Sequence, residues 1–139
     1  MNVATKPAKH SAPGQYLGFA LQSVRLCYHL LTCPKGARVS LEYLDDVGVH
    51  FSDGTILLEQ TKSALAQNPL SDWAEDLWKA IANWLHSLST GGLPEKVYFQ
   101  IYVTPPKTGK LAQEINDAEN EAQVAAITAS VLVPPFLGT

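Results

Sequence analysis

The sequence is short of positive charge, of long apolar runs and of cysteine. Its 139 residues hold 10 Lys and Arg against 13 Asp and Glu, a formal net charge of -3, so the basic surplus typical of nucleic-acid-binding chains is missing. Its apolar runs, such as residues 56–58, fall far below the roughly 20 residues of a membrane span. The first thirteen residues lack the apolar core of a secretory signal, so we expect a cytoplasmic protein without membrane contact.

Cysteine occurs twice, as Cys27 and Cys33. Their spacing fits neither a zinc site nor a disulfide framework, and we expect both thiols to be buried. What the chain does have is a hydrophobic share of 46%, which is enough to build a core in a single domain of this length. We therefore predict a flexible N-terminal segment over residues 1–13, which is polar and contains Pro7 and Pro13, and one domain over residues 14–139.

Hydrophobic periodicity predicts an α/β fold with a mixed sheet that contains a β-hairpin and is flanked by helices. The expected elements are a helix over 16–31, one or two strands over 37–51 with a kink at Asp45 and Asp46, a returning strand over 55–62, a helix over 70–88, a strand over 96–104, a helix over 110–129 and a short strand over 131–133. Apolar residues of the first helix recur at three- and four-residue steps: Leu17, Ala20, Leu21, Val24, Cys27, Tyr28 and Leu31.

The helix over 70–88 carries the three tryptophans. Trp73 and Trp84 share a stripe with other apolar residues and should pack in the core, whereas Trp78 lies off that stripe and can be exposed. Asp72, followed three residues later by Glu75, resembles a capping box at the start of this helix.

Polar side chains suited to metal-dependent phosphodiester hydrolysis gather on the hairpin. Such chemistry needs hard oxygen ligands for Mg²⁺, a water acidified by that metal and a nearby cation. If Ser52, Asp53 and Gly54 form a three-residue loop, then Phe51 pairs with Thr55 and Asp46 lies opposite Gln60. Alternation along the returning strand then puts Lys62 on the face of Gln60.

A shift of the turn by one residue would exchange the two neighbouring acids. With a two-residue turn at Asp53 and Gly54, Asp45 would face the side of Lys62 instead. We favour Asp46 and keep Asp45 as the alternative. In a purely structural interpretation, both acids end a strand at a polar kink, and Gln60 and Lys62 form its solvated end.

Four motifs give the chain a family resemblance. Residues 18–22 (GFALQ), 41–47 (LEYLDDV), 58–62 (LEQTK) and 68–72 (NPLSD), in this order, resemble the Gln-x-Lys variant of the PD-(D/E)XK nuclease superfamily. Within it, they are similar to the DNA endonuclease domain of CD-NTase-associated antiphage effector proteins. The resemblance covers about residues 14–105 and implies a restriction-endonuclease-like core, followed in such effectors by a ligand-sensing domain.

The resemblance also implies roles for particular residues. Asp46 would bind the metal, Gln60 would stand where most relatives have Glu or Asp, and Lys62 would be the catalytic lysine. Gln22 on the first helix and Glu42 would add further metal contacts. The implied activity is Mg²⁺-dependent cleavage of double-stranded DNA in antiphage defence, with Mn²⁺ as a possible substitute.

A different class of function stays open. The acidic balance and the apolar residues 131–137 are also compatible with an inactive, nuclease-like interaction module that works with a partner subunit, a sensor domain or a second copy of itself.

Because the neutral Gln60 replaces a carboxylate, the metal site would carry less negative charge and bind the ion less tightly.

Overall fold

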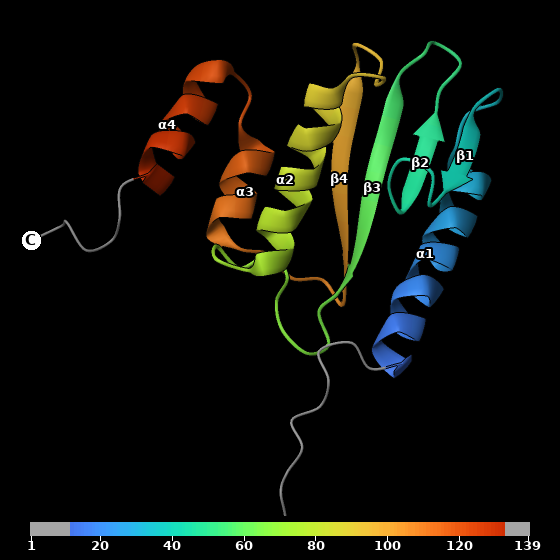
Figure 1. Ribbon diagram of the computed structural model, residues 1–139, viewed down its shortest axis with the longest axis horizontal. Helices are drawn as coiled ribbons and strands as arrows, with labels where there is room; N and C mark the ends of the chain where they lie inside the picture. Colours follow the sequence, from blue (N-terminus) through green and yellow to red (C-terminus); the bar gives the residue numbers. More distant parts are fainter. Residues whose placement is uncertain (1–11, 133–139) are drawn as a thin grey trace, which may run out of the picture.

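The computed structural model describes residues 12–132, and most of the predicted N-terminal segment lies outside this range (Figure 1). Four strands form one mixed sheet in the order β1-β2-β3-β4, in which the first three are antiparallel and β4 runs parallel to β3. The predicted α/β class and mixed sheet are confirmed. The elements are α1 (Ala12–Thr32), β1 (Arg38–Leu41), β2 (Val47–His50), β3 (Ile56–Ser63), α2 (Glu75–Thr90), β4 (Val97–Thr104), α3 (Lys110–Asp117) and α4 (Glu121–Leu132).

The hairpin between β2 and β3 has the register expected from a three-residue loop. The backbone N–H of Phe51 donates to the carbonyl of Thr55 over 2.9 Å, and Val47 is the partner of Glu59 in the ladder. Gly54 has a φ of 88°, in the left-handed region that glycine enters without steric cost. This register places residue 46 level with Gln60, as predicted.

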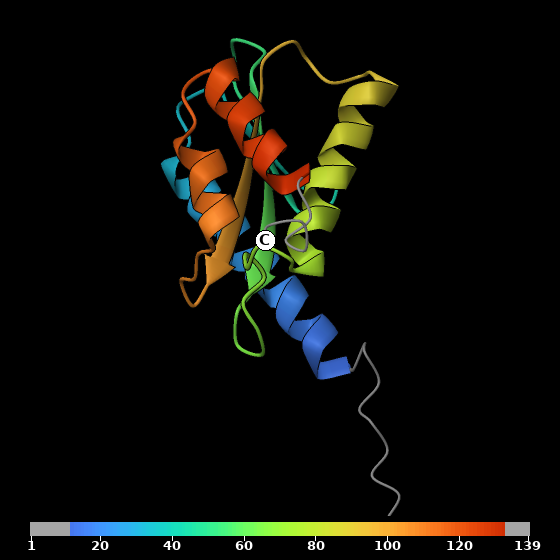
Figure 2. The same ribbon diagram turned by 90° about the vertical axis from the view of Figure 1, so that its left-hand side faces the viewer.

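Alternation along β3 sends neighbouring side chains to opposite faces of the sheet. Glu59 contacts α1, through Arg25 and His29, whereas Lys62 pairs with Asp76 of α2. The two helices therefore cover opposite faces, and α3 and α4 lie on the same side of the sheet as α2 (Figure 2). Gln60 and Lys62 belong to the α2 face.

Several predicted element ends were wrong. The first helix begins at Ala12 rather than residue 16 and includes Pro13 in its first turn, where a missing N–H costs nothing. The helix predicted over 110–129 is two helices, because the chain leaves helical geometry at Ala118. Val131 belongs to α4 rather than to a strand, and the end of that predicted strand, Val133, lies outside the described residues.

The predicted capping box is also wrong. The Oδ1 atom of Asp72 accepts the backbone N–H of Leu111, in the first turn of α3, over 2.9 Å. Asp72 therefore satisfies an N–H at the start of a helix 39 residues away, and α2 begins after Ala74 without a side-chain cap. Since α2 starts only at Glu75, Trp73 lies outside the helix and is 71% exposed, which corrects its placement in the core.

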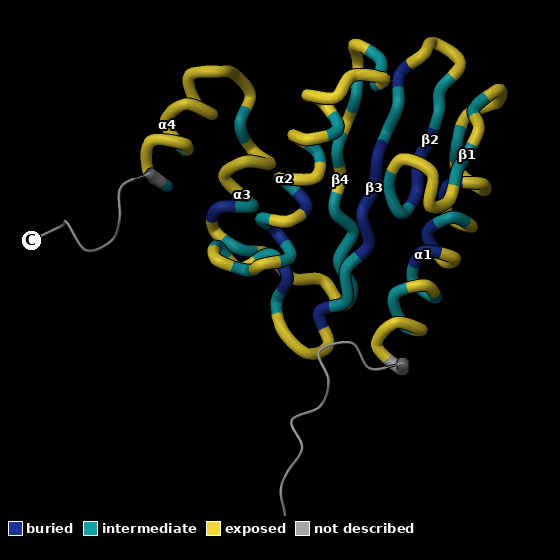
Figure 3. Tube along the Cα trace, in the orientation of Figure 1, coloured by how far each residue is buried: buried dark blue, intermediate teal, exposed yellow. Residues whose placement is uncertain are grey.

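The buried core follows the sheet and the inner faces of α1 and α2 (Figure 3). Its fully or nearly fully buried apolar residues include Val47, Val49, Leu58, Leu77 and Ala80. The prediction of buried thiols was wrong, because Cys27 is exposed and Cys33 half-buried. Between Ala12 and Leu132, no helix has the length and apolarity that crossing a bilayer would require.

Candidate functional site

A polar cleft of about 360 Å³ opens where the chain between β1 and β2 approaches β3 and α2. The residues that line it are Glu42, Tyr43, Leu44, Asp45, Asp46, Gln60, Lys62 and Asn83. The structure therefore brings together all the predicted site residues except Gln22. That side chain lies on the buried side of α1 with Arg25 and His29, toward the opposite face of the sheet.

Asp46 lies directly before the first residue of β2. Because β2 begins only at Val47, the N–H of Thr61 on the neighbouring strand needs another acceptor. The Oδ2 atom of Asp46 provides it over 2.8 Å and also accepts the Thr61 hydroxyl over 3.1 Å. This carboxylate is thus fixed in the cleft wall by the edge of β3.

Asp45 lines the cleft together with Gln60. Its Oδ2 atom accepts the indole N–H of Trp84 over 2.8 Å. Burial raises the pKa of Asp45 above its ordinary value, although the hydrogen bond from Trp84 acts in the opposite direction. The alternative acid of the sequence prediction therefore has a pKa that the fold perturbs.

Lys62 forms the cationic wall of the cleft. Its Nζ atom lies 3.8 Å from the Oδ1 atom of Asp76, in the first turn of α2, and its side chain is 25% exposed. This distance is at the long end for an ion pair, so Asp76 holds the ammonium group only weakly. The ammonium group stays within reach of the cleft. Lys62 is placed to act on groups near Gln60, two residues earlier on the same face.

Behind the cleft, a buried ionic cluster fixes the other face of β3. Glu59, whose exposure is 0%, accepts hydrogen bonds from Arg25 at 2.7 and 2.8 Å and from Gln100 at 2.7 Å, and bonds to His29 at 3.0 Å. The Arg25 guanidinium also lies between two aromatic rings, 4.2 Å from the ring centre of Tyr28 and 4.0 Å from that of Tyr102.

Sequence reasoning missed this cluster. Burial alone would raise the pKa of Glu59, but hydrogen bonds from Arg25 and His29 outweigh burial and lower it. The Glu59 hydrogen bond in turn raises the pKa of Arg25. A signal was available, since Arg25 and His29 stand four residues apart on a helix that otherwise has no Lys, Arg, Asp or Glu, and such a pair faces one side.

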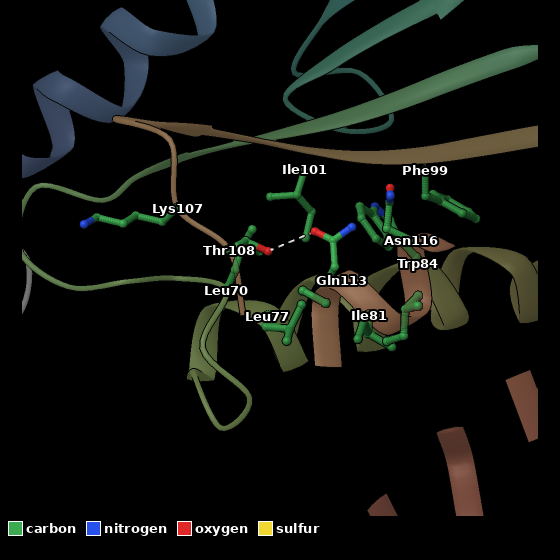
Figure 4. Close-up of a pocket in the computed structure, with 12 residues that line it drawn as sticks. Leu70, Leu77, Ile81, Trp84, Phe99, Ile101, Lys107, Thr108, Gln113 and Asn116 are labelled. Atoms are coloured by element: carbon green, nitrogen blue, oxygen red, sulfur yellow. Dashed lines mark hydrogen bonds between the residues drawn. The ribbon is translucent and has the colours of Figure 1, made fainter. Parts of the chain in front are cut away.

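Trp84 lies between the polar cleft and a second cavity, whose lining mixes apolar and polar residues. The cavity, of about 560 Å³, lies between β4, α2 and α3, and Figure 4 shows Trp84 beside Phe99, Ile81 and Asn116 at one end. The rings of Trp84 and Phe99 stack with centroids 4.9 Å apart. Trp84 therefore donates its N–H to Asp45 while its ring stacks on Phe99.

Comparisons with known proteins give no match, whether with protein-family models, with curated proteins or with solved structures. Within the described part of the chain, no three His, Cys, Asp or Glu side chains are grouped closely enough to hold a metal ion by themselves. The side-chain oxygen atoms that line the cleft include the amide oxygen of Gln60 and the carboxylates of Asp45 and Asp46.

We predict that Trp84→Phe raises the pKa of Asp45 further, because it removes the N–H donor and keeps an aromatic ring against Phe99. A raised pKa favours the protonated carboxyl in the folded chain. The loss in free energy of unfolding, about 1 kcal/mol for one hydrogen bond, should thus be larger at neutral pH than below the ordinary pKa of 3.8. Carboxyl NMR titration and urea unfolding at two pH values measure both effects.

Trp78→Phe is the matched control for this substitution. The indole N–H of Trp78 donates to the carbonyl of Asp72, so its loss should leave the pKa of Asp45 unchanged. An equal shift in both variants would mean that Trp84 does not act through its hydrogen bond.

Proposed function

We propose that the chain is a divalent-metal-dependent endonuclease for double-stranded DNA with a role in antiphage defence. The observation that carries the proposal is the cleft in which Asp45, Asp46 and Gln60 meet Lys62. The order of elements supports it: one helix, three antiparallel strands, a helix and a parallel strand is the order expected for a restriction-endonuclease-like core of the PD-(D/E)XK type.

The donor set of the cleft fits a hard cation such as Mg²⁺ or Mn²⁺. Asp45, Asp46 and Gln60 offer carboxylate and amide oxygens, the ligands such ions prefer. The raised pKa of Asp45, caused mainly by burial, indicates a carboxylate whose negative charge the surrounding protein compensates poorly. When bound there, a divalent cation would acidify a coordinated water and offset charge on the phosphate.

The chain's own residues would orient the reactants. Lys62 would hold the attacking water or a phosphate oxygen by a charge-assisted hydrogen bond, with its position limited by Asp76. Gln60, which lines the cleft with Asp45, would offer its amide oxygen to the ion. Because Gln60 is neutral, we expect metal affinity to be lower than at a site with a carboxylate in its place.

A second candidate function is an inactive, nuclease-like module that works with a partner subunit. The lack of a group of three metal-binding His, Cys, Asp or Glu side chains in the described residues favours it. Cations outside the cleft that could contact phosphates are also few and scattered in the described residues: Lys35, Arg38, Lys79, Lys96, Lys107 and Lys110. Few such contacts would give weak DNA binding with a shallow dependence on salt concentration.

Incubation of the purified chain with supercoiled plasmid DNA tests the proposal. Nicking that requires Mg²⁺ or Mn²⁺ and stops with a chelator is the expected result. Calorimetry should show metal binding that is tighter in Gln60→Glu, because the substitution adds a negative ligand. The nuclease proposal would be contradicted, and the module favoured, if neither the wild-type chain nor Gln60→Glu cleaves DNA or binds metal at millimolar concentrations.

A further inference from the structure

The outer face of α1 has no charged side chain. This helix is 21 residues long, and its Arg25 and His29 both turn inward to Glu59. Figure 1 shows α1 alone on its side of the sheet, and Figure 3 shows the exposed residues along its outer side. A solvent-facing helix normally carries charges on that side, so this face is unusual for one that meets only water.

A stripe of defined spacing runs along this face. Tyr16, Ala20, Ser23, Cys27 and Leu30 follow one another at steps of four and three residues, the spacing by which two helices interlock along a seam. All are exposed except Ala20, which is half-buried. Larger side chains flank the seam on both sides. The exposed apolar members of this face are Tyr16 at 77%, Phe19 at 63%, Val24 at 62%, Leu30 at 58% and Leu31 at 80%, with Tyr28 at 49% along its edge.

The exposed face of α1, which includes the stripe and its flanking side chains, is large enough to form an interface. An aromatic side chain can bury about 200 Å², so the three aromatic residues alone leave roughly 400 Å² uncovered, and the three aliphatic ones add to this. Contiguous apolar patches on monomers are typically about 300–600 Å², and a stable dimer covers about 800 Å² on each partner. The exposed face therefore approaches the area that one half of a dimer needs.

We propose that this face binds a second copy of the chain, with the two α1 helices antiparallel about a two-fold axis near Ser23. Two identical uncharged faces can pair without any opposite charge on the partner. The side chains are bulky at both ends of the stripe and small at Ala20, Ser23 and Cys27, so the helices can approach closely at the centre. A two-fold rotation then brings the Tyr16 end of one helix against the Leu31 end of the other.

The proposed dimer leaves the polar cleft open. The cleft involves Lys62 and Asn83 on the α2 side of the sheet, whereas the outer face of α1 is on the other side. Pairing through α1 is consequently independent of whether the cleft cleaves DNA, and its test does not use nuclease activity.

Sedimentation equilibrium over a concentration series tests the dimer. We expect the wild-type chain to approach twice the mass of one chain, and the double variant Phe19→Lys, Val24→Lys to stay at the mass of one, because it places charges in the interface. Leu65→Lys is the control, since Leu65 is 71% exposed in the segment between β3 and α2 and should leave the dimer unchanged. A wild-type monomer at every concentration, or a dimer that survives both lysines, would overturn the proposal.

Cross-linking tests the antiparallel geometry even if the lysine variants fail to fold. In a background with Cys27→Ser and Cys33→Ser, Ser23→Cys should form a disulfide-linked dimer on mild oxidation. Tyr16→Cys should not, because the two copies of this position would lie roughly 20 Å apart at 1.5 Å per residue, well beyond the roughly 7 Å between Cα atoms that a disulfide can bridge. Equal cross-linking of both variants, or of neither, would contradict the proposed pairing.

Discussion

Lys62→Ala should lower the rate of metal-dependent plasmid cleavage by about 100- to 10,000-fold, the usual contribution of a group that positions or transfers a proton. The reason is the place of this amine in the cleft, on the same face of β3 as Gln60. The side chain is partly exposed, and its ion pair with Asp76 spans 3.8 Å, so the substitution should cost little stability. Cleavage rates at saturating Mg²⁺, with circular dichroism to confirm folding, measure the effect.

Lys79→Ala is the matched control for this prediction. Lys79 lies one helical turn after Glu75 on α2 and pairs with it over 2.7 Å, outside the cleft. Its removal changes the net charge equally and should leave the cleavage rate within about twofold of the wild-type rate. Cleavage that persists in Lys62→Ala, or falls equally in both variants, would sink the proposed role of Lys62.

Glu59→Ala should lower the free energy of unfolding by about 3–5 kcal/mol, because it leaves the buried guanidinium of Arg25 without a counter-charge. Urea unfolding measures this change. Glu114→Ala provides the comparison, since Glu114 makes a 4.0 Å pair with Lys110 on the surface of α3 and should change stability by less than about 0.5 kcal/mol. Similar losses in the two variants would show that the Arg25 cluster adds nothing beyond a surface pair.

The contribution of Glu59 also has a defined pH dependence. Because the folded chain lowers the pKa of Glu59, its stabilisation is fully present above the ordinary pKa of 4.5 and is lost as the pH falls through the lowered folded value. The gap in stability between the wild-type chain and Glu59→Ala should therefore narrow in acid. A gap that stays constant as the pH falls would mean that the ionised carboxylate is not what stabilises the cluster.

The register of the hairpin could be predicted because it depends on local chemistry. Gly54 permits the left-handed residue of a three-residue loop, and the period of two on either side then fixes every later pair. The side-chain contacts of Asp45 and Asp46 could not be predicted in the same way. Glu42 has a φ of 51°, the chain from there to β2 follows no repeating geometry, and Asp45 is oriented by Trp84, 39 residues away.

Hydrophobic periodicity could not predict which side of α1 is buried, for another reason. Apolar residues occur on both sides of this helix, so a step of three or four residues describes the exposed stripe as well as the buried one. What selects the inner side is the pairing of Arg25 with Glu59, a contact 34 residues apart in sequence. The prediction of a buried Cys27 was wrong because the sequence alone does not show the contact between Arg25 and Glu59.

Glu59 and Gln60 are adjacent in the sequence but have different roles in the structure. Glu59 compensates the charge of Arg25 in the interior, so its replacement endangers the fold itself, whereas Gln60 and Lys62 line the cleft on the other face of β3. Under the proposed function, a descendant of this chain could lose catalysis through a change at Lys62, whose ion pair is partly exposed, and remain folded. Retention of Glu59 in such a descendant would reflect the needs of folding, whereas retention of Lys62 would reflect the proposed chemistry.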